Sequence, residues 1–245
     1  MIEVTTKKFI FKKKNIWFSD SPFDVRGCDA VFFFACKNKV SLDGFIRTED
    51  HTFIIDLTQD IDSIWKGISK RVRTYIKRAK KLEVEIKINH GHEEFKRLFF
   101  NFATQKGFKP PTEPFDIMKN HGTLFSAYYN GKLIAGTLTI DDTNIMREYI
   151  RASKRLEITD DNKMKEIMNV SSKLMVWEAI VYAKEQGKQI YDFGGYYPTE
   201  DKNDPRYTIK IFKQRFGGKP VVYYKYTKYY SVLYRLIKNL LSLKK

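Results

Sequence analysis

The chain has 245 residues, of which 42% are hydrophobic and 30% charged, a balance typical of a folded globular protein and not of a disordered one. This length accommodates one large domain, or one domain with a partial second. Lysine and arginine number 45 against 29 acidic residues, which gives a formal net charge of +16. Such a surplus favours polyanionic partners, namely nucleic acid, an anionic membrane or phosphate-bearing substrates. The alternative is that the charge only keeps the protein soluble.

Cysteine and histidine usage predicts neither a disulfide framework nor a metal site. Cys28 and Cys36 form no Cys-x-x-Cys pair, and His90 and His92 lie in a polar turn without metal-ligand spacing. The first residues lack the pattern of a signal peptide, and no segment is long and apolar enough to span a membrane. These features favour a cytoplasmic location.

The first part of the chain predicts short strands and then a long helix. The strand candidates, separated by polar turns, are Lys8–Lys12, Ala30–Cys36, Val40–Arg47 and Thr52–Leu57. From Ile61 to Ala79, apolar residues recur every three or four positions, which predicts a helix with one face in the core. Thr58 or Asp60 is expected to cap this helix, because a short side-chain oxygen satisfies the free N–H groups of its first turn.

The middle of the chain predicts a second helix, a three-strand meander and a third helix. The second helix covers Glu93–Gln105. In the meander, Asn130 and Gly131 separate two apolar strands and tolerate the positive φ angles of a two-residue turn. The third strand is expected at Ile145–Arg151. The third helix, about Glu166–Glu185, is apolar on more than one face and should be deeply packed.

The last part predicts a short buried strand, a short helix, another strand and a final amphipathic helix. These elements are Ile190–Phe193, Tyr207–Phe216, Val221–Tyr226 and Tyr229–Leu243. Taken with the preceding elements, this order predicts a mixed sheet with helices packed on it, an α/β or α+β architecture.

Three stretches resemble the Fem family, the GNAT-fold aminoacyl-tRNA-dependent transferases that build peptidoglycan cross-bridges. Asp56-Leu57 leads into the basic helix, as at the entry to the family's second domain. The meander with its Asn-Gly turn is the second stretch. The third and most specific is Tyr191-Asp192-Phe193-Gly194-Gly195, followed by the segment IFKQRFGG at 211–218. By these motifs the resemblance extends from about Thr52 to Tyr226.

The resemblance implies a GNAT-like acyl-N-acyltransferase fold with a reduced N-terminal part. Full-length Fem enzymes contain two GNAT-like domains and are considerably longer. We therefore expect residues 1–57 to form a reduced β-rich part, 58–228 the catalytic domain and 229–245 a basic amphipathic helix. Part of the acceptor site in the family lies on or near the first domain, so the acceptor stays open.

The function implied by the resemblance is aminoacyl transfer. The donor would be aminoacyl-tRNA, the acceptor an amino group of a phosphate-bearing cell-wall or surface-polysaccharide precursor, and no cofactor would be bound. One alternative is an acetyl-CoA-dependent N-acetyltransferase acting on an amino sugar or lipid-linked glycan. Such enzymes usually hold the CoA pyrophosphate on a glycine-containing loop, whereas the matching segment, Asp160–Asn169, contains no glycine. A second alternative is a non-catalytic RNA-binding module, which explains the charge but not the third motif.

Lys213 and Asp192 are the catalytic candidates. The family links the matching lysine to the donor phosphate and the reacting carbonyl, and a lysine there can act as a point charge on phosphate or on a developing oxyanion. Asp192 follows a strand, where it could accept a proton or orient the acceptor amine; alternatively it caps the next turn. The substrate-binding candidates are basic or aromatic residues in or near the motifs: Arg73, Lys77, Tyr196, Lys210 and Arg215.

The final helix carries leucine and aromatic residues beside arginine and lysine. This composition suits a helix that rests on a membrane surface, close to a lipid-linked acceptor at the inner face of the membrane. The alternative is a helix docked on its own domain.

Overall fold

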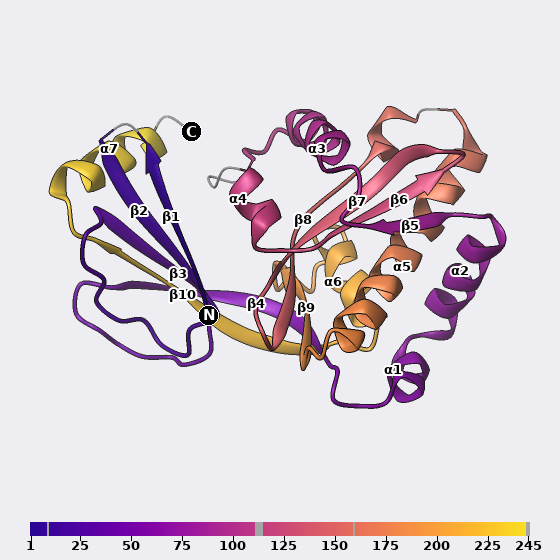
Figure 1. The fold of residues 1–245 in the computed structure, drawn as a ribbon, viewed down its shortest axis with the longest axis horizontal. Helices are drawn as coiled ribbons and strands as arrows, with labels where there is room; N and C mark the ends of the chain where they lie inside the picture. The colour runs from indigo at the N-terminus through magenta and orange to yellow at the C-terminus, as the bar shows by residue number, and fades with distance from the viewer. Residues whose placement is uncertain (9, 111–114, 159, 244–245) are drawn as a thin grey trace. The chain divides into compact units, whose positions relative to one another are not determined.

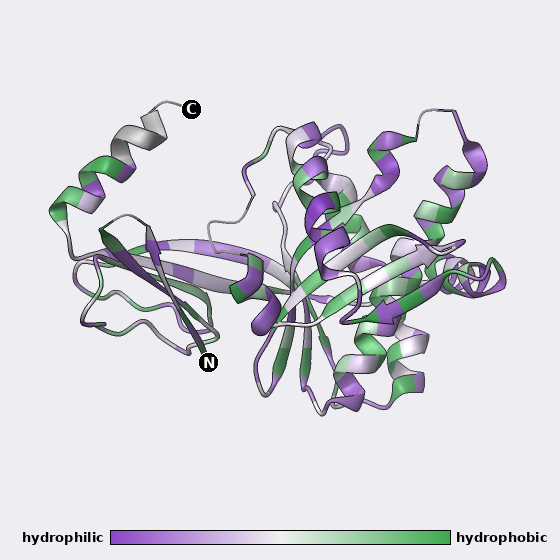
Figure 2. Cartoon of the chain, turned by 45° about the horizontal axis from the view of Figure 1, so that its top comes forward, coloured by the Kyte–Doolittle hydropathy of each residue, from purple (hydrophilic) through white to green (hydrophobic). Residues whose placement is uncertain are grey.

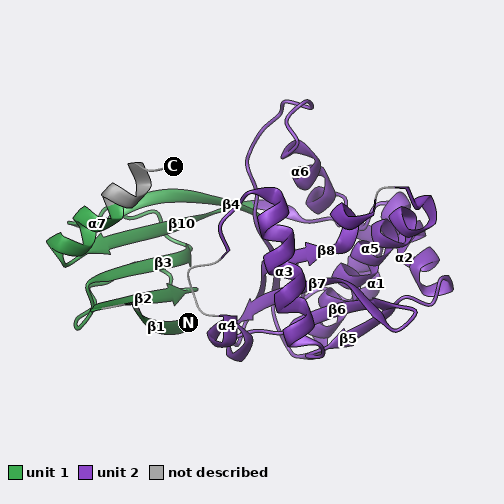
Figure 3. Ribbon diagram, turned by 90° about the horizontal axis from the view of Figure 1, so that it is seen from above, with its two compact units in different colours: residues 1–52, 221–245 green, residues 53–220 purple. Residues whose placement is uncertain are grey.

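The computed structural model describes residues 1–8, 10–110, 115–158 and 160–243. The chain forms two compact units (Figures 1 and 3): unit 1 is residues 1–52 with 221–245, and unit 2 is residues 53–220. The last strand, β10 (Lys219–Tyr229), pairs with the N-terminal strand β3 (Ala30–Cys36). For this reason most of β10 and the final helix belong to unit 1, and the division differs from the expected boundaries at 57/58 and 228/229.

Unit 1 contains the strands β1-β2-β3-β10, in that order, together with residues 46–52 of strand β4 (Ile46–Asp56). The pair β1 (Ile2–Lys8) and β2 (Phe11–Trp17) is antiparallel, β2 and β3 are parallel, and β3 and β10 are antiparallel. The strand predicted at Lys8–Lys12 is wrong, since its described residues span the end of β1 and the start of β2. Buried apolar residues form the core of this unit, namely Ile16, Val31, Phe33, Cys36 and Tyr226.

The strand predicted at Val40–Arg47 is also wrong. Residues 40–45 form an irregular loop, and the next strand, β4 (Ile46–Asp56), begins at Ile46. The Oη atom of Tyr226 accepts a hydrogen bond from Val40 N and donates one to Asn38 O, both at 2.8 Å. These bonds occupy main-chain groups that a strand would use for pairing.

Unit 2 contains the strands β9-β8-β7-β6-β5, in that order, together with residues 53–56 of β4. These are β5 (Glu85–Ile88), β6 (Leu124–Tyr129), β7 (Lys132–Asp141), β8 (Ile145–Ser153) and β9 (Ile190–Gly195). The neighbours are antiparallel except for β8 and β9, which run parallel. The predicted hairpin is confirmed, with φ angles of 49° at Asn130 and 71° at Gly131.

The helix predicted from Ile61 to Ala79 is two helices, α1 (Ile61–Gly67) and α2 (Lys70–Lys81). The break falls at Ile68, which is extended, and at Ser69, whose N–H donates to the carbonyl of Arg215 at 2.9 Å. Asp60 caps α1 as expected, because its carboxylate accepts a hydrogen bond from Ser63 N.

The remaining helices of unit 2 are α3 (His92–Lys106), α4 (Phe115–Asn120), α5 (Asn162–Glu185) and α6 (Tyr207–Gln214). Helix α5 is deeply packed as predicted, since residues such as Ile167, Val170, Met175 and Ile180 are buried in the main core. Figure 2 shows that apolar residues continue along α5 and the strands on which it lies.

Helix α7 (Val232–Leu243) follows β10 in unit 1. Its exposed apolar side chains include Val232, Leu233 and Leu236. In the described part of the chain, no helix combines the length and the apolar character needed to cross a membrane.

Candidate active site

The parallel strands β8 and β9 pair only over their first residues. The register joins Ile145 to Ile190 and ends at Arg147 and Asp192, although both strands continue further. Beyond this point the carbonyls of Gly194 and Gly195 on β9 accept hydrogen bonds from a side chain. In α/β proteins such carboxyl ends of strands are where ligands bind.

Lys213 supplies those hydrogen bonds from helix α6. Its side chain is buried (7% exposed), and Nζ donates to the carbonyls of Gly194 and Gly195, each at 2.7 Å. Burial lowers the pKa of Lys213 to about 8, although the charges of Glu148 and Asp192 oppose this shift. The amine therefore remains mostly protonated at neutral pH but titrates within the range of enzyme assays.

Gly194 is fixed in a conformation that only glycine adopts easily. Its φ angle is +71°, and a Cβ atom placed there would lie 2.5 Å from the carbonyl oxygen of Glu148. The N–H of Gly194 donates to Asp192 Oδ1 at 2.8 Å. The Gly-Gly motif thus lets β9 turn against β8 while its carbonyls point at Lys213.

Asp192 is fully buried, and both of its oxygens are engaged. Oδ1 accepts from Gly194 N, and Oδ2 accepts from Arg147 Nη1 at 2.7 Å. The charged partners are 0% and 5% exposed. This geometry fits the alternative that Asp192 holds the following turn, and its predicted direct role in catalysis stays a prediction.

Glu148 and Arg151, both on β8, extend this network at partly buried positions and were not found from the sequence. Glu148 Oε1 accepts hydrogen bonds from Arg151 Nη2 and from Tyr191 Oη, both at 2.7 Å. Arg151 Nε donates to Thr137 Oγ1 at 3.0 Å. One signal could have found them: charged residues in a strand with apolar neighbours must pair with one another when the strand is buried.

The other candidates on and before α6 have varied surroundings. Tyr196 packs on the core, with its ring centroid 4.7 Å from that of Phe53. Lys210 forms an ion pair with the exposed Glu200. Arg215 is exposed at the end of α6, and its carbonyl accepts from Ser69.

On helix α2, the basic residue that contacts an aromatic ring is Arg71, whereas the substrate-binding candidates were Arg73 and Lys77. Arg73 is half-buried and Lys77 is exposed, one turn apart on the same helix. Arg71 instead lies over the ring of Tyr75, with 5.6 Å between its Cζ atom and the ring centroid, and donates from Nε to Tyr75 Oη at 3.0 Å. The ammonium of Lys173, on α5, approaches the same ring at 5.7 Å.

Solved structures resemble this chain, although no family model and no curated protein sequence matches it. The crystal structure of FemX aligns with a TM-score of 0.62 and 14% identity, over 96% of this chain and 86% of that one. L-PGS from Bacillus licheniformis aligns with a TM-score of 0.54 and 14% identity, over 87% and 72%. The chain has a Fem-like GNAT fold. The predicted fold is confirmed, and the likeness reaches well beyond the motif-bearing range 52–226.

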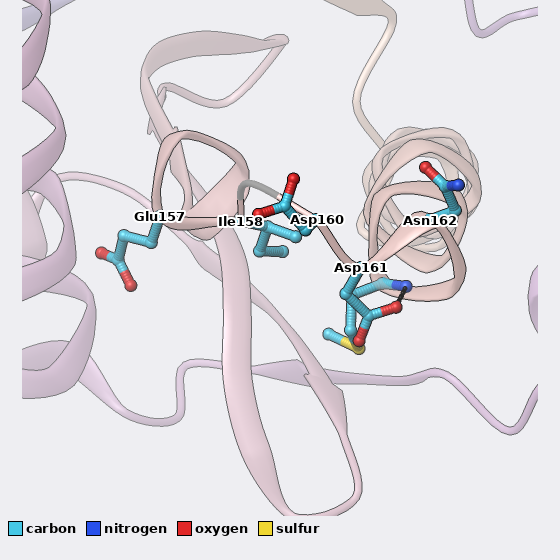
Figure 4. Close-up of a pocket in the computed structure, with 6 residues that line it drawn as sticks. Glu157, Ile158, Asp160, Asp161 and Asn162 are labelled. Atoms are coloured by element: carbon cyan, nitrogen blue, oxygen red, sulfur yellow. Dashed lines mark hydrogen bonds between the residues drawn. The ribbon is translucent and has the colours of Figure 1, made fainter.

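Acidic residues precede helix α5, which bears on the choice of acyl donor. In a GNAT fold the N–H groups before this helix usually bind the CoA pyrophosphate. Here Asp161 caps the helix and accepts from Met164 N at 2.9 Å. Glu157, Asp160 and Asp161 line a surface hollow of about 700 Å³ at this position (Figure 4). Carboxylates in that place repel a pyrophosphate and compete for the N–H groups that would bind it.

Proposed function

We propose that this protein is an acyltransferase that moves an aminoacyl group from aminoacyl-tRNA to an amino group of a cell-wall or surface-polysaccharide precursor. The observation that carries the proposal is the buried amine of Lys213, held at the carboxyl end of β9 by Gly194 and Gly195. The Fem-like fold supports an acyltransferase, and the names FemX and L-PGS of two structural neighbours agree with it.

The reaction exchanges an ester for an amide. The acceptor nitrogen attacks the ester carbonyl, a C–N bond forms, the C–O bond to the ribose oxygen of the tRNA breaks, and the proton lost by the nitrogen ends on that oxygen. Negative charge develops on the carbonyl oxygen in between. The ammonium of Lys213 has three N–H donors, and the carbonyls of Gly194 and Gly195 use two. The third is available to stabilise that charge.

Two features favour aminoacyl-tRNA over acetyl-CoA as the donor. The formal charge of +16 suits a polyanionic partner. The carboxylates of Glu157, Asp160 and Asp161, which precede α5, oppose binding of the pyrophosphate of CoA at the start of that helix. An acetyl-CoA-dependent transfer to an amino sugar remains the alternative enzyme. A non-catalytic RNA-binding module would explain the charge but would give no reason for burying Lys213.

The deciding experiment compares binding of aminoacyl-tRNA, uncharged tRNA and acetyl-CoA to the purified protein at two salt concentrations. We expect a preference for the charged tRNA that survives the higher salt, because contacts to the aminoacyl ester do not depend on counterion release. Saturable binding of acetyl-CoA, with only salt-sensitive binding of both tRNAs, would replace this proposal by the acetyl-CoA alternative. Equal affinity for both tRNAs at each salt concentration would favour the RNA-binding module.

We also propose that helix α7 contacts an anionic membrane surface. Val232, Leu233 and Leu236 are 74%, 54% and 55% exposed, and Arg235 lies among them. An apolar stripe next to basic residues is typical of helices that lie in the membrane interface. In the sequence, two further basic residues, Lys244 and Lys245, follow the helix, but they lie outside the described residues. This contact would bring the enzyme to a lipid-linked acceptor.

A further inference from the structure

Three cations from three different elements surround two aromatic rings in unit 2. Arg71 of α2 and Lys173 of α5 both lie over Tyr75, at 5.6 and 5.7 Å from its ring centroid. Lys173 and Arg151 of β8 both lie over Phe212, at 5.5 and 5.2 Å. The rings therefore hold the three cations close together, although like charges repel. The two aromatic side chains belong to α2 and α6, so four elements build this arrangement.

Two further arginines add to the positive charge at Lys173. Arg155 and Arg215 are exposed, and with Arg71 and Arg151 they disfavour the protonated amine. Burial and these four charges lower the pKa of Lys173 to about 8. The amine donates to the neutral amide oxygen of Asn169. Glu148 pairs with Arg151 and so offsets part of this charge from one side.

We infer that Lys173, Arg71 and Arg151 form a binding subsite for a phosphate group of the substrate. Guanidinium groups bind phosphate oxygens in pairs, and an ammonium adds a point charge, so this set matches the chemistry of a phosphate. A phosphate anion would also relieve the repulsion among the cations. The inference rests on the proposed function, because the subsite adjoins the Lys213 network through the Arg151–Glu148 pair.

The phosphate has two candidate sources in the proposed reaction. One is the phosphodiester at the aminoacylated end of the donor RNA, and the other is the diphosphate of a nucleotide-linked acceptor. The rings of Tyr75 and Phe212 are compatible with either, since a nucleotide base also stacks on aromatic side chains. The shared chemistry is a phosphate bound by clustered arginines and one lysine.

Pyrophosphate is the probe for this subsite, with its binding measured by calorimetry. We expect Lys173→Met and Arg71→Gln each to weaken binding at least tenfold. Lys81→Gln is the matched control, because Lys81 is an exposed base on the same helix as Arg71. It should change binding less than twofold. Equal weakening in all three variants would show non-specific attraction to a basic surface and would overturn the inference, as would unchanged binding in Lys173→Met.

A second readout follows the Lys173 amine itself. NMR titration of lysine side chains, assigned by comparison with Lys173→Met, should show the pKa of Lys173 rising by at least one unit when pyrophosphate saturates the wild-type protein. An unchanged pKa would place the anion elsewhere. The titration is made on the wild-type protein, and only the Lys173→Met variant used for assignment has to fold.

Competition then identifies the source of the phosphate. Displacement of pyrophosphate by a CCA trinucleotide, but not by uridine diphosphate, would assign the subsite to the donor; the opposite pattern would assign it to the acceptor. Displacement by neither would overturn the substrate-phosphate inference. Lys213→Met separates this inference from the proposed function, because it should abolish transfer but keep pyrophosphate binding within a factor of about three. If transfer depends on Lys213 but the protein does not bind pyrophosphate, the subsite is wrong and the proposed function still stands.

Discussion

The amine of Lys213 lies 2.7 Å from the carbonyl oxygen of Gly194, so that one buried cation joins helix α6 to the end of strand β9. The same glycine donates its N–H to Asp192, which in turn pairs with Arg147 of β8. The position of Lys213 is therefore set by both parallel strands. Such a chain of hydrogen bonds keeps a charged group in place without any movement when substrate arrives, which is what electrostatic catalysis requires.

Replacing Lys213 by methionine should abolish acyl transfer. Methionine keeps the length of the side chain but removes the charge that we expect to stabilise the carbonyl oxygen, a loss of at least about 100-fold in the rate of the chemical step. The measurement is single-turnover transfer from aminoacyl-tRNA. The buried carbonyl of Gly194 and the part-buried carbonyl of Gly195 lose their donor, so a fall in stability of roughly 1–3 kcal/mol is also expected. Assays therefore belong well below the lowered Tm.

Lys202→Met is the control for this variant. Lys202 is an exposed lysine in the loop before α6. Its removal should change the transfer rate less than about threefold, because substitutions of exposed side chains have small effects. If Lys213→Met retained full activity while folded, the site would be wrongly assigned.

The transfer rate should depend on the protonation of Lys213. Because its pKa is about 8, a rate that needs the ammonium falls as the pH rises through 8. Lys213→Arg keeps the positive charge up to much higher pH, since the pKa of arginine exceeds 12. The falling limb should therefore disappear in a pH profile of single-turnover rates for Lys213→Arg. A falling limb at the same pH in this variant would assign the titration to another group.

Local sequence patterns predicted two kinds of element. One has main-chain hydrogen bonds between residues close in the sequence, and the other shows the residue pattern of a strand. The strand Ala30–Cys36 and the Asn130-Gly131 hairpin are examples. The errors have long-range causes. The helix breaks at Ser69 because Arg215 accepts its N–H, and residues after Val40 form a loop because Tyr226 binds there. Neither partner can be recognised from the neighbouring sequence.

The same distinction holds for the site. Lys213 was found because a motif surrounds it, and Gly194 because glycine pairs are visible in any sequence. Glu148 and Lys173 were missed, since their importance depends on which elements pack together. Glu148 becomes a partner of Tyr191 only through the parallel register of β8 and β9. Lys173 lies within a largely apolar helix, where the pattern predicts core packing and gives no reason to select one lysine.

Breaking the buried Arg147–Asp192 pair should destabilise unit 2. Asp192→Asn removes one charge and leaves Arg147 buried without its counter-ion, at a cost of about 3–5 kcal/mol. Chemical denaturation measures this loss. Arg78→Gln is a suitable comparison, because its pair with Glu166 is largely exposed and should contribute less than about 1 kcal/mol. Equal losses in the two variants would mean that the pair at Asp192 does not hold the end of β9.

Lys173→Met should stabilise the protein while weakening its binding of anions. The pKa of Lys173 is lowered in the folded state, so the unfolded chain binds the proton more tightly. Protonation of Lys173 therefore lowers stability at neutral pH, and this effect disappears as the pH rises from about 8 towards the ordinary lysine value. Thermal unfolding should show a higher Tm for Lys173→Met at pH 7 and a smaller difference at pH 10. A lower Tm at pH 7 would contradict this.

Helix α7 should determine affinity for anionic vesicles. Leu233→Ser and Leu236→Ser remove exposed apolar side chains that we expect to enter the interface, and each should weaken binding to phosphatidylglycerol-containing vesicles by about tenfold, or roughly 1.4 kcal/mol. Leu42→Ser is the control, because Leu42 is a 40% exposed leucine of the same unit outside the helix. Co-sedimentation with vesicles at two salt concentrations measures the effect. If all three variants bind the vesicles equally and high salt removes this binding, the net charge alone explains it. Such a result would exclude insertion of α7.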